Sequence, residues 1–451
     1  MKIVLINPNL VALRKDFFTT GIVYMPIGLA YKAASLRKSG KEIVVIDAFG
    51  EKPRQARKTK DFLFLGLSRQ EIVERLPSNA TNVIVYANHL TNHLSIIEIV
   101  RSIRQAYPNL PISVLENTQA VTAYSLSRVA DEFYEAGANN LLTGEAYDGS
   151  TYPAWDLFPI ANYWKLRFAH GPQSSKRYLP LLTSRGCPFN CKFCLAPALT
   201  DRKWQARPAQ DVVDEIESHL KVFNVSEFHI EDLNPTVSED RFRDISNEIL
   251  KRKLKVTWKI VSGTKAESIG EKTIDLMAKA GCHYISISPE TGSPELLKKM
   301  GKPFDFDHAI KIIKRMNKVG ISSQACFVLG FPGETNEDLK MTDDFVRKLT
   351  RIGIDEIALF IISPVPGAQI YEQFYGFKSL SELNFSPSWR KDYVFLNSFR
   401  LKLYLKFILW KIIYHPLKVL RQIFNFLTRR FATKMEMVPY RAFVFKWLDM
   451  I

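Results

Sequence analysis

Apolar runs alternate with helical patterns along the first 150 residues of the chain. Such alternation predicts a parallel sheet covered by helices. The expected strands span residues 2–7, 42–48, 82–87, 112–116 and 140–143. Residues 1–150 are therefore predicted to form a flavodoxin-like, doubly wound α/β domain. Ligands of such domains bind at the carboxyl ends of the strands.

The same alternation resumes at residue 177, after a segment without clear periodicity. Residues 151–176 contain Pro153 and Pro159 among aromatic residues, and they are interpreted as a linker packed across two domains. Six further strands are expected at residues 177–182, 227–230, 255–260, 284–288, 322–329 and 356–361. Six strand–helix units predict a partial (β/α)6 barrel over residues 177–375, with its chemistry at the carboxyl ends of the strands.

The region 376–451 has a different pattern, rich in aromatic and basic residues. Two helices are expected, Phe399–Tyr414 and Pro416–Arg430, with Pro416 in the first turn of the second. In this second helix Lys418, Arg421 and Arg429 share one side, and a broad apolar face remains. Basic amphipathic helices with large apolar residues are typical of interfacial membrane segments. The alternative is a helical cap packed on the barrel, with its lysines solvated.

Charge and composition narrow the function classes. The formal net charge of the 451 residues is +16, and much of it lies between residues 399 and 451, where eleven Lys or Arg face two acids. Basic excess favours RNA or an anionic membrane surface as a partner. The short apolar start lacks a cleavage site, no apolar run reaches the length of a membrane span, and the five cysteines form no even framework. We expect a cytoplasmic protein that is peripheral on the inner face of the membrane if the tail docks there.

Three of the five cysteines, Cys187, Cys191 and Cys194, fall within eight positions with the spacing C-x3-C-x2-C. Cysteine thiolates hold iron–sulfur clusters, and a cubane cluster has four ligand positions. Three thiolates therefore suit a cubane with one iron left for a ligand that is not protein. The alternatives are a structural zinc site, which usually takes four protein ligands, and inert buried cysteines. Cys282 and Cys326 fall in expected strands and are interpreted as core residues.

The stretch from Thr183 to Cys194 resembles the signature of the radical S-adenosylmethionine (SAM) enzymes. The resemblance implies a [4Fe-4S] cluster on Cys187, Cys191 and Cys194, with SAM bound to the free iron. In that family the cluster cleaves SAM to methionine and a 5′-deoxyadenosyl radical. The resemblance also implies that Phe193 lies against the adenine.

The expected strand ends extend this resemblance. The family carries acidic residues at the end of the second barrel strand that receive the amino group of SAM, here Glu231 first and Asp232 second. Glu290 begins a Glu-Thr-Gly sequence similar to one whose glutamate lies near the ribose and carboxylate of SAM. Ser262 is also predicted to contact SAM. Gly330, at the end of the fifth strand, is expected to let the backbone approach adenine closely.

The N-terminal domain resembles the cobalamin-binding domain of the cobalamin-dependent radical SAM family. The resemblance rests on residues 26–31, 45–47 and 143–145, and the predicted cofactor contacts are Asn7, Asn88, Gly144 and Glu145 at the strand ends. Two features of the sequence differ from the pattern of that family. No Asp-x-His-x-x-Gly sequence offers a lower axial cobalt ligand, and residues 116–117 replace a usual glycine pair. The alternative is a domain that has lost its cofactor and forms a wall of the substrate cavity.

Two histidines four positions apart, His89 and His93, could be taken for metal ligands. They are interpreted instead as part of a solvated loop end. No residue in the sequence stands out as a substrate-side acid, base or radical relay, so the catalytic residues stay unassigned.

These observations predict a membrane-associated radical SAM enzyme that uses cobalamin to methylate an unactivated carbon of a lipid or other hydrophobic metabolite. A flavodoxin- or ferredoxin-type protein is expected to donate the electron. The first alternative is a radical SAM enzyme that cyclises, couples or rearranges its substrate without methyl transfer. RNA modification is disfavoured because no cysteine precedes Cys187 to hold a second cluster, so no nucleic-acid partner is expected. A non-catalytic metal protein with a membrane-docking tail is the remaining alternative.

Overall fold

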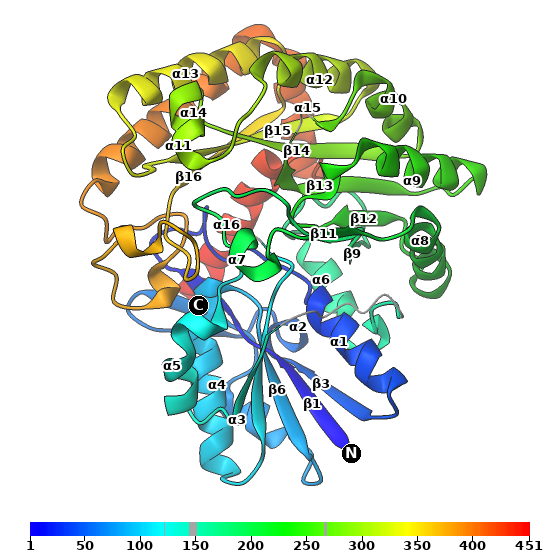
Figure 1. The fold of residues 1–451 in the computed structure, drawn as a ribbon, viewed down its shortest axis with the longest axis vertical. Coiled ribbons are helices and arrows are strands. Elements are labelled where there is room, and N and C mark those ends of the chain that lie inside the picture. The colour runs from blue at the N-terminus through cyan, green and yellow to red at the C-terminus, as the bar shows by residue number, and fades with distance from the viewer. Residues whose placement is uncertain (121, 144–150, 266–267) are drawn as a thin grey trace.

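The structure is a computed structural model that describes residues 1–120, 122–143, 151–265 and 268–451. Two parallel sheets organise these residues, one in the N-terminal domain and one in the barrel (Figure 1). The carboxyl ends of strands from both sheets meet at one cavity, which both domains therefore line. The α/β fold class predicted from the sequence is confirmed.

The N-terminal sheet has five parallel strands in the order β3-β1-β6-β7-β8, as in doubly wound flavodoxin-like folds. Its strands are β1 (Lys2–Asn7), β3 (Glu42–Asp47), β6 (Asn82–Ala87), β7 (Ile112–Glu116) and β8 (Asn140–Leu142). Successive side chains of a strand point to opposite faces. Ile3 and Leu5 accordingly pack with α1 (Ile27–Lys38), whereas Val4 and Ile6 pack with α4 (His93–Ala106) and α5 (Ala130–Glu135).

A small antiparallel sheet beside this domain was not predicted. It has the order β2-β5-β4, from β2 (Leu10–Leu13), β5 (Phe62–Leu65) and β4 (Ala56–Lys58). Two short helices, α2 (Ala48–Glu51) and α3 (Arg69–Glu74), complete the N-terminal part. The backbone N–H of Val11 in β2 donates to Asn92 Oδ1 at 2.8 Å, which ties this sheet to the loop that follows β6.

The barrel sheet has six parallel strands in the order β16-β15-β14-β13-β12-β9 and does not close on itself. Its strands are β9 (Leu179–Leu181), β12 (Glu227–Ile230), β13 (Thr257–Thr264), β14 (Cys282–Glu290), β15 (Ser322–Leu329) and β16 (Glu356–Ile361). Longer helices cover its outer face: α8 (Ala209–Phe223), α9 (Glu239–Lys251), α10 (Glu271–Lys279), α12 (Phe306–Val319) and α13 (Asn336–Arg351). The shorter elements are α6 (Ile160–Leu166), β10 (Ser184–Gly186), α7 (Ala196–Thr200), β11 (Trp204–Ala206) and α11 (Pro294–Met300).

A buried ion pair of the barrel binds a tyrosine of the N-terminal domain. Arg207 Nη1 lies 2.6 Å from Glu215 Oε2 on α8, and the hydroxyl of Tyr31 on α1 donates to the same carboxylate at 3.1 Å. Arg207 also donates to the carbonyl of Leu182 at 2.6 Å. The N-terminal helix α1 is thereby fixed against the barrel.

The C-terminal region forms three helices rather than the two expected, α14 (Tyr393–Tyr414), α15 (Pro416–Thr428) and α16 (Lys434–Met450). Helix α14 packs on α13 and β16. Helix α16 runs between the two sheets (Figure 1), where Asp449 pairs with Arg14 at 2.6 Å and the Phe445 ring contacts Phe17. The tail is therefore in part a cap on the barrel and in part a link between the domains.

Helix α15 has an inverted amphipathic arrangement. Its polar side faces the protein: Lys418 Nζ lies 2.9 Å from Asp355 Oδ1, and Gln422 Nε2 donates to Thr433 Oγ1 at 3.0 Å. Its apolar side is exposed, and none of its residues is buried. The exposed apolar residues are Leu417, Leu420, Ile423, Phe424 and Leu427. No helix of the described residues has the length and apolar character needed to span a bilayer.

Candidate functional site

The cysteine loop follows β9, at the carboxyl edge of the barrel sheet. Gly186, just before Cys187, has a φ of +76°, and a Cβ at this position would lie 2.0 Å from the carbonyl oxygen of Lys203. Only glycine fits where the loop passes this backbone so closely. The sequence therefore delivers the three cysteines through a turn that other residues could not make.

The thiols of Cys191 and Cys194 have raised pKa values. Burial is the largest cause that raises the pKa of Cys191 to about 11 and that of Cys194 to about 12; neighbouring cysteine thiols contribute to the rise, and Lys302 opposes it. Ligand thiols lose their protons when metal binds. In the described part of the chain, no group of three or more His, Cys, Asp and Glu side chains surrounds a single metal-ion position.

Asp232, one of the two acids predicted to bind the SAM amino group, is fully engaged by the protein. Its carboxylate accepts hydrogen bonds from the Thr183 N–H and hydroxyl, each at 2.7 Å, and from the Ser184 hydroxyl. Arg241 Nη1 donates to the Thr183 carbonyl at 2.9 Å. These contacts hold the strand that enters the cysteine loop.

Glu290 forms a buried ion pair with Lys302, a residue that the sequence analysis missed. Glu290 ends β14 in a left-handed conformation with a φ of +64°, which is rare for residues other than glycine. Burial alone would lower the pKa of Lys302, but Glu290 and Cys191 raise it above its ordinary value. Lys302 therefore stays charged beside the cysteine loop.

The remaining predicted SAM contacts have different surroundings. Phe193 packs against a small apolar cluster that includes Val328 and Phe331. Ser262 is buried within β13. Gly330 does not leave an open face: a Cβ there would lie 2.5 Å from Leu396, and its carbonyl accepts from Arg390 at 2.9 Å. The close approach that Gly330 permits in this structure is to the C-terminal region.

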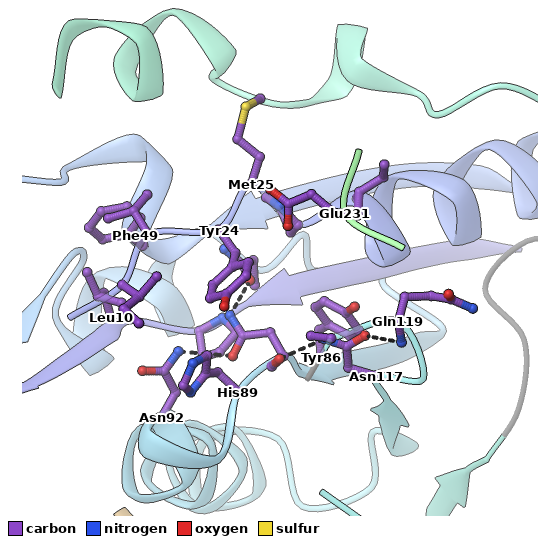
Figure 2. Close-up of a pocket in the computed structure, with 18 residues that line it drawn as sticks. Leu10, Tyr24, Met25, Phe49, Tyr86, His89, Asn92, Asn117, Gln119 and Glu231 are labelled. Atoms are coloured by element: carbon purple, nitrogen blue, oxygen red, sulfur yellow. Dashed lines mark hydrogen bonds between the residues drawn. The ribbon is translucent and has the colours of Figure 1, made fainter. Parts of the chain in front are cut away.

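A chain of side-chain amides lines the carboxyl edge of the N-terminal sheet. Asn7 Nδ2 donates to Asp47 Oδ1 at 2.8 Å, Asn88 Nδ2 donates to Asn7 Oδ1 at 3.0 Å, and Asn92 Nδ2 donates to Asn88 Oδ1 at 3.0 Å. Asn117 Nδ2 donates to the Asn88 carbonyl at 2.7 Å. These amides border a cavity of about 30 Å³ that Figure 2 shows. The predicted contacts Asn7 and Asn88 thus share one site, whereas Gly144 and Glu145 lie outside the described residues.

Glu231 enters this same cavity from the barrel, at the end of β12. Its Oε2 lies 3.5 Å from His170 Nδ1, and burial raises its pKa to about 7. The ring of Tyr24 stacks on His170, with centroids 4.5 Å apart, and its centroid lies 5.6 Å from that of His89. Glu231 therefore faces the N-terminal domain, across from the amide chain.

The interpretation of His89 and His93 as a solvated loop end is wrong, because both rings are buried. His93 Nδ1 lies 3.0 Å from the Tyr124 hydroxyl, and its Nε2 lies 3.0 Å from Glu132 Oε2. His89 lines the cavity beside Tyr24. Single-sequence patterns gave no sign of this, since the residues that cover the rings, such as Tyr24 for His89 and Tyr124 for His93, lie 31 or more positions away in the sequence.

A second polar cluster lies inside the barrel where α16 begins. Tyr284 OH donates to Glu356, whose other oxygen accepts from the Met435 N–H at 2.7 Å. Lys434 Nζ donates to the Val261 carbonyl at 3.0 Å. Burial lowers the pKa of Lys434, Cys326 is buried nearby, and Cys282 is buried in the core as expected. No sequence motif indicates this cluster, because its members come from five segments, β13, β14, β15, β16 and α16.

Comparison with known proteins gives consistent results. Residues 181–346 match the model described as the radical SAM superfamily. An uncharacterized methyltransferase of Pyrococcus horikoshii is 24% identical over 87% of this chain and 86% of its own length. Cytidylyl-2-hydroxyethylphosphonate methyltransferase of Streptomyces wedmorensis is 25% identical over 82% and 81%, respectively. The anaerobic magnesium-protoporphyrin IX monomethyl ester cyclase of Rubrivivax gelatinosus is 30% identical over 43% of this chain and 36% of its own.

Two solved structures share the fold of most of this chain. The radical SAM methyltransferase TsrM from Kitasatospora setae, with tryptophan and a SAM analogue, aligns with a TM-score of 0.59 at 16% identity over 84% of this chain and 77% of that one. The cobalamin-dependent SAM radical enzyme OxsB, with aqua-cobalamin and SAM, aligns with a TM-score of 0.58 at 18% identity over 89% and 56%. At these identities the likeness shows the fold alone.

Proposed function

We propose that this chain, in which residues 181–346 match the radical SAM superfamily, is a cobalamin-dependent enzyme that methylates an unactivated carbon of a hydrophobic substrate. One observation carries the proposal: the barrel edge that bears the cysteine loop faces the carboxyl edge of a doubly wound domain across a shared cavity. Two relatives that cover most of the chain are named methyltransferases.

The residues around the cysteine loop fit a [4Fe-4S] cluster with SAM. Cys187, Cys191 and Cys194 would hold three irons, and the positive charge of Lys302 offsets the negative charge of thiolates. When bound, such a cluster supplies an electron, taken from a flavodoxin- or ferredoxin-type donor, that cleaves SAM to the 5′-deoxyadenosyl radical. The protein's own part is to fix the loop through Asp232 and to keep the charged pair Lys302 and Glu290 beside it.

The donor groups of the cavity fit cobalamin, whose corrin ring is bordered by amide side chains. The amides of Asn7, Asn88 and Asn117 can exchange hydrogen bonds with such groups. When bound, cobalamin supplies the methyl group that ends on the substrate carbon. A cavity of about 30 Å³ holds little more than a water molecule, so binding must displace residues 22–26, which form one wall.

The inverted arrangement of α15 supports a lipid substrate and a membrane surface as partner. A helix of a globular protein usually turns its apolar face inward, whereas α15 exposes Leu420 and Phe424. Arg421, Arg429 and Arg430 are exposed on the same helix and its end, which suits anionic lipid headgroups. An apolar cavity of about 270 Å³ between α14, α15 and α16 adds space for a hydrophobic chain.

Anaerobic purification with cobalamin supplied tests the cofactors. Roughly four irons per chain are expected, together with about one cobalt. Cys191→Ala should lose iron, whereas Cys282→Ala, which changes a buried core thiol, should retain it. Four irons without cobalt after reconstitution would contradict the methyl transfer proposed here and leave a SAM-cleaving enzyme.

Vesicle flotation tests the membrane surface. The wild type should float with vesicles that contain anionic lipid, and Leu420→Glu with Phe424→Glu should remove that binding. Val222→Glu is the matched control, because Val222 is similarly exposed but lies on α8, outside the C-terminal region. Equal flotation of the Leu420→Glu, Phe424→Glu double variant and the Val222→Glu control would contradict docking through α15.

A second candidate function is cyclisation without methyl transfer. It is favoured by the similarity of 43% of this chain to an anaerobic cyclase and by Glu116 and Asn117 in place of the usual glycine pair. Mass spectrometry of the product distinguishes the two, since only methyl transfer adds a labelled carbon from methyl-labelled SAM.

A further inference from the structure

We propose that an acidic electron-carrier protein docks on a basic surface beside the cysteine loop, formed by Arg185, Lys192, Arg202, Lys203 and Lys298. This inference rests on the proposed function, because it takes the cysteine loop as the place where SAM receives its electron. The carrier loses one electron and SAM gains it. The bond from the SAM sulfur to its 5′ carbon then breaks to give methionine and the 5′-deoxyadenosyl radical.

The cysteine loop reaches the surface of the protein. Cys187 and Cys191 are partly exposed. Toward the interior the loop meets buried groups, since Lys302 influences the Cys191 thiol and Phe193 packs against an apolar cluster. Electron tunnelling rates fall steeply with distance, so a carrier has to dock on the exposed side of this loop. The side chains on that side therefore decide which carriers fit.

The first basic group borders the residue before Cys187. The carbonyl oxygen of Lys203 lies against Gly186, where a Cβ would be only 2.0 Å from it. Asp201 and Arg202 have φ values of +48° and +57°, so the chain turns sharply between α7 and β11. Arg202 and Lys203 are exposed, and the Lys203 side chain retains 83% of its accessible surface. Two positive charges thus lie at the surface next to the start of the loop.

The second basic group borders the residue after Cys191. The Lys192 N–H donates to the carbonyl of Met300 at 3.0 Å, which fixes the loop on the end of α11. Lys192 and Lys298, the latter in the last turn of α11, are both exposed. The cysteine sequence therefore runs between two exposed basic groups.

This concentration of positive charge is local. Outside residues 399–451 the chain has 51 Lys or Arg and 44 Asp or Glu, which is a small excess. Residues 185–205 alone contain four basic residues and one acid, Asp201, and α11 adds two lysines and one acid, Glu295. The basic surface is therefore distinct from the general charge of the chain, and it favours an acidic partner.

A partly exposed aromatic ring accompanies these charges. Phe189 lies between Cys187 and Cys191 in the sequence, and the Nζ of Lys265 lies 4.0 Å from the centroid of its ring. Protein interfaces combine aromatic residues at the centre with a polar rim. Electron-transfer complexes are small, and charge complementarity steers their encounter. These features fit an acidic carrier of the flavodoxin or ferredoxin type.

An experiment with two electron sources tests the surface. The full-length protein is reconstituted anaerobically with iron and sulfide, and calorimetry measures its affinity for flavodoxin and for ferredoxin. The wild type should bind at least one of them, and Lys203→Glu with Lys298→Glu should weaken that binding about tenfold or more. Dithionite, a small reductant that needs no docking surface, should still drive SAM cleavage in this variant at the wild-type rate.

Lys311→Glu with Lys314→Glu is the matched control, because it makes the same change in net charge at exposed lysines of α12 on the outer face of the barrel. This variant should bind the carrier as the wild type does. Raising the salt concentration from ~50 mM to ~300 mM should also weaken binding by the wild type. That measurement is informative even if Lys203→Glu with Lys298→Glu does not fold, and a salt-independent affinity would contradict docking through charge.

Other outcomes overturn the inference. They are equal affinities of the two double variants, and a wild type that binds neither carrier. Binding of an RNA oligonucleotide instead, removed by Lys203→Glu with Lys298→Glu, would assign the surface to nucleic acid. None of these results affects the proposed function. That function fails if dithionite yields no 5′-deoxyadenosine from wild-type protein with full iron content, and the basis of this inference then fails with it.

Discussion

The ammonium of Lys302 donates a hydrogen bond to the carboxylate of Glu290, and both side chains are buried beside the cysteine loop. Gly301 ends α11 with a φ of +69° and lets the chain turn so that Lys302 follows directly. A zwitterionic amino acid headgroup bound next to this pair would meet both a cation and an anion. The pair is therefore the strongest charged feature near the predicted SAM position.

Replacing Lys302 by methionine should destabilise the protein and weaken SAM binding. The substitution leaves the Glu290 carboxylate buried without its partner, which costs about 3–5 kcal/mol. Thermal unfolding and calorimetric SAM titration measure the two effects. Lys299→Met, which alters an exposed lysine of α11 three residues before Lys302, is the control and should change neither. Matching results for the two variants would show that the pair has no role in either property.

Asp232→Ala should release iron from the cysteine loop. Without the carboxylate, the Thr183 and Ser184 donors lose their acceptor and Arg241 loses its nearby anion at 4.0 Å. The strand that enters the loop is then free to shift. Iron analysis after anaerobic reconstitution measures the loss, with the exposed Asp240→Ala as control. Full iron content in Asp232→Ala would refute this positioning role.

Glu356→Gln should gain stability relative to the wild type as the pH rises. Burial raises the pKa of Glu356 to about 7 from 4.5, although hydrogen bonds from Tyr284 and Met435 and the charge of Lys434 lower it. The folded protein therefore holds a proton that the unfolded chain releases between pH 4.5 and 7. Stability falls over this window by about 3 kcal/mol.

The measurement compares the melting temperatures of the two proteins at pH 5 and pH 8. Measuring them in parallel cancels the contribution of other buried carboxyls such as Glu231, whose pKa is also raised to about 7 by burial. The difference between wild type and variant should change in favour of the variant at pH 8. A difference independent of pH would disprove the assignment to Glu356.

Gly21→Val should loosen α16. Gly21 has a φ of +66°, and a Cβ there would lie 2.3 Å from Phe445 Cε2. Gly40 has a φ of +77° and no atom within 4 Å of its Cβ position, so Gly40→Val carries only the backbone cost of about 1–2 kcal/mol. Hydrogen exchange of residues 434–450 should rise in Gly21→Val alone. A similar rise in both variants would point to general destabilisation.

The strands were predictable because their apolar runs coincide with complete burial, as at Val4, Leu5 and Ile6. The cysteine loop was predictable because cluster-type ligands lie close together in the sequence. The third C-terminal helix carried a signal that was not used: Thr433 and Glu436 have the spacing of a capping box, and that box is present in the structure. Pro439 inside the helix obscured the pattern.

Other site residues had no local signal. Lys302 is one of several lysines near the end of α11, and only its pairing across space with Glu290 distinguishes it. The burial of His89 depends on Tyr24 and on barrel residues such as Glu231, which are far away in the sequence. The Lys434 cluster likewise depends on α16 entering the barrel. Periodicity reports which face of an element is buried, but not which distant segment covers it.

The position of α16 sets an order of events during synthesis. Residues 434–450 leave the ribosome after both sheets, yet Arg14 pairs with Asp449, and Arg441 donates to the Phe18 carbonyl at 2.8 Å. Until then the segment that leads to Tyr24 has no support from this helix. A large cofactor supplied during translation would meet an interdomain space that is still open. One supplied later would have to break the contacts that α16 makes with the N-terminal domain. If the chain binds cobalamin as proposed, the timing of cofactor supply relative to the docking of α16 sets how easily the interdomain space is filled.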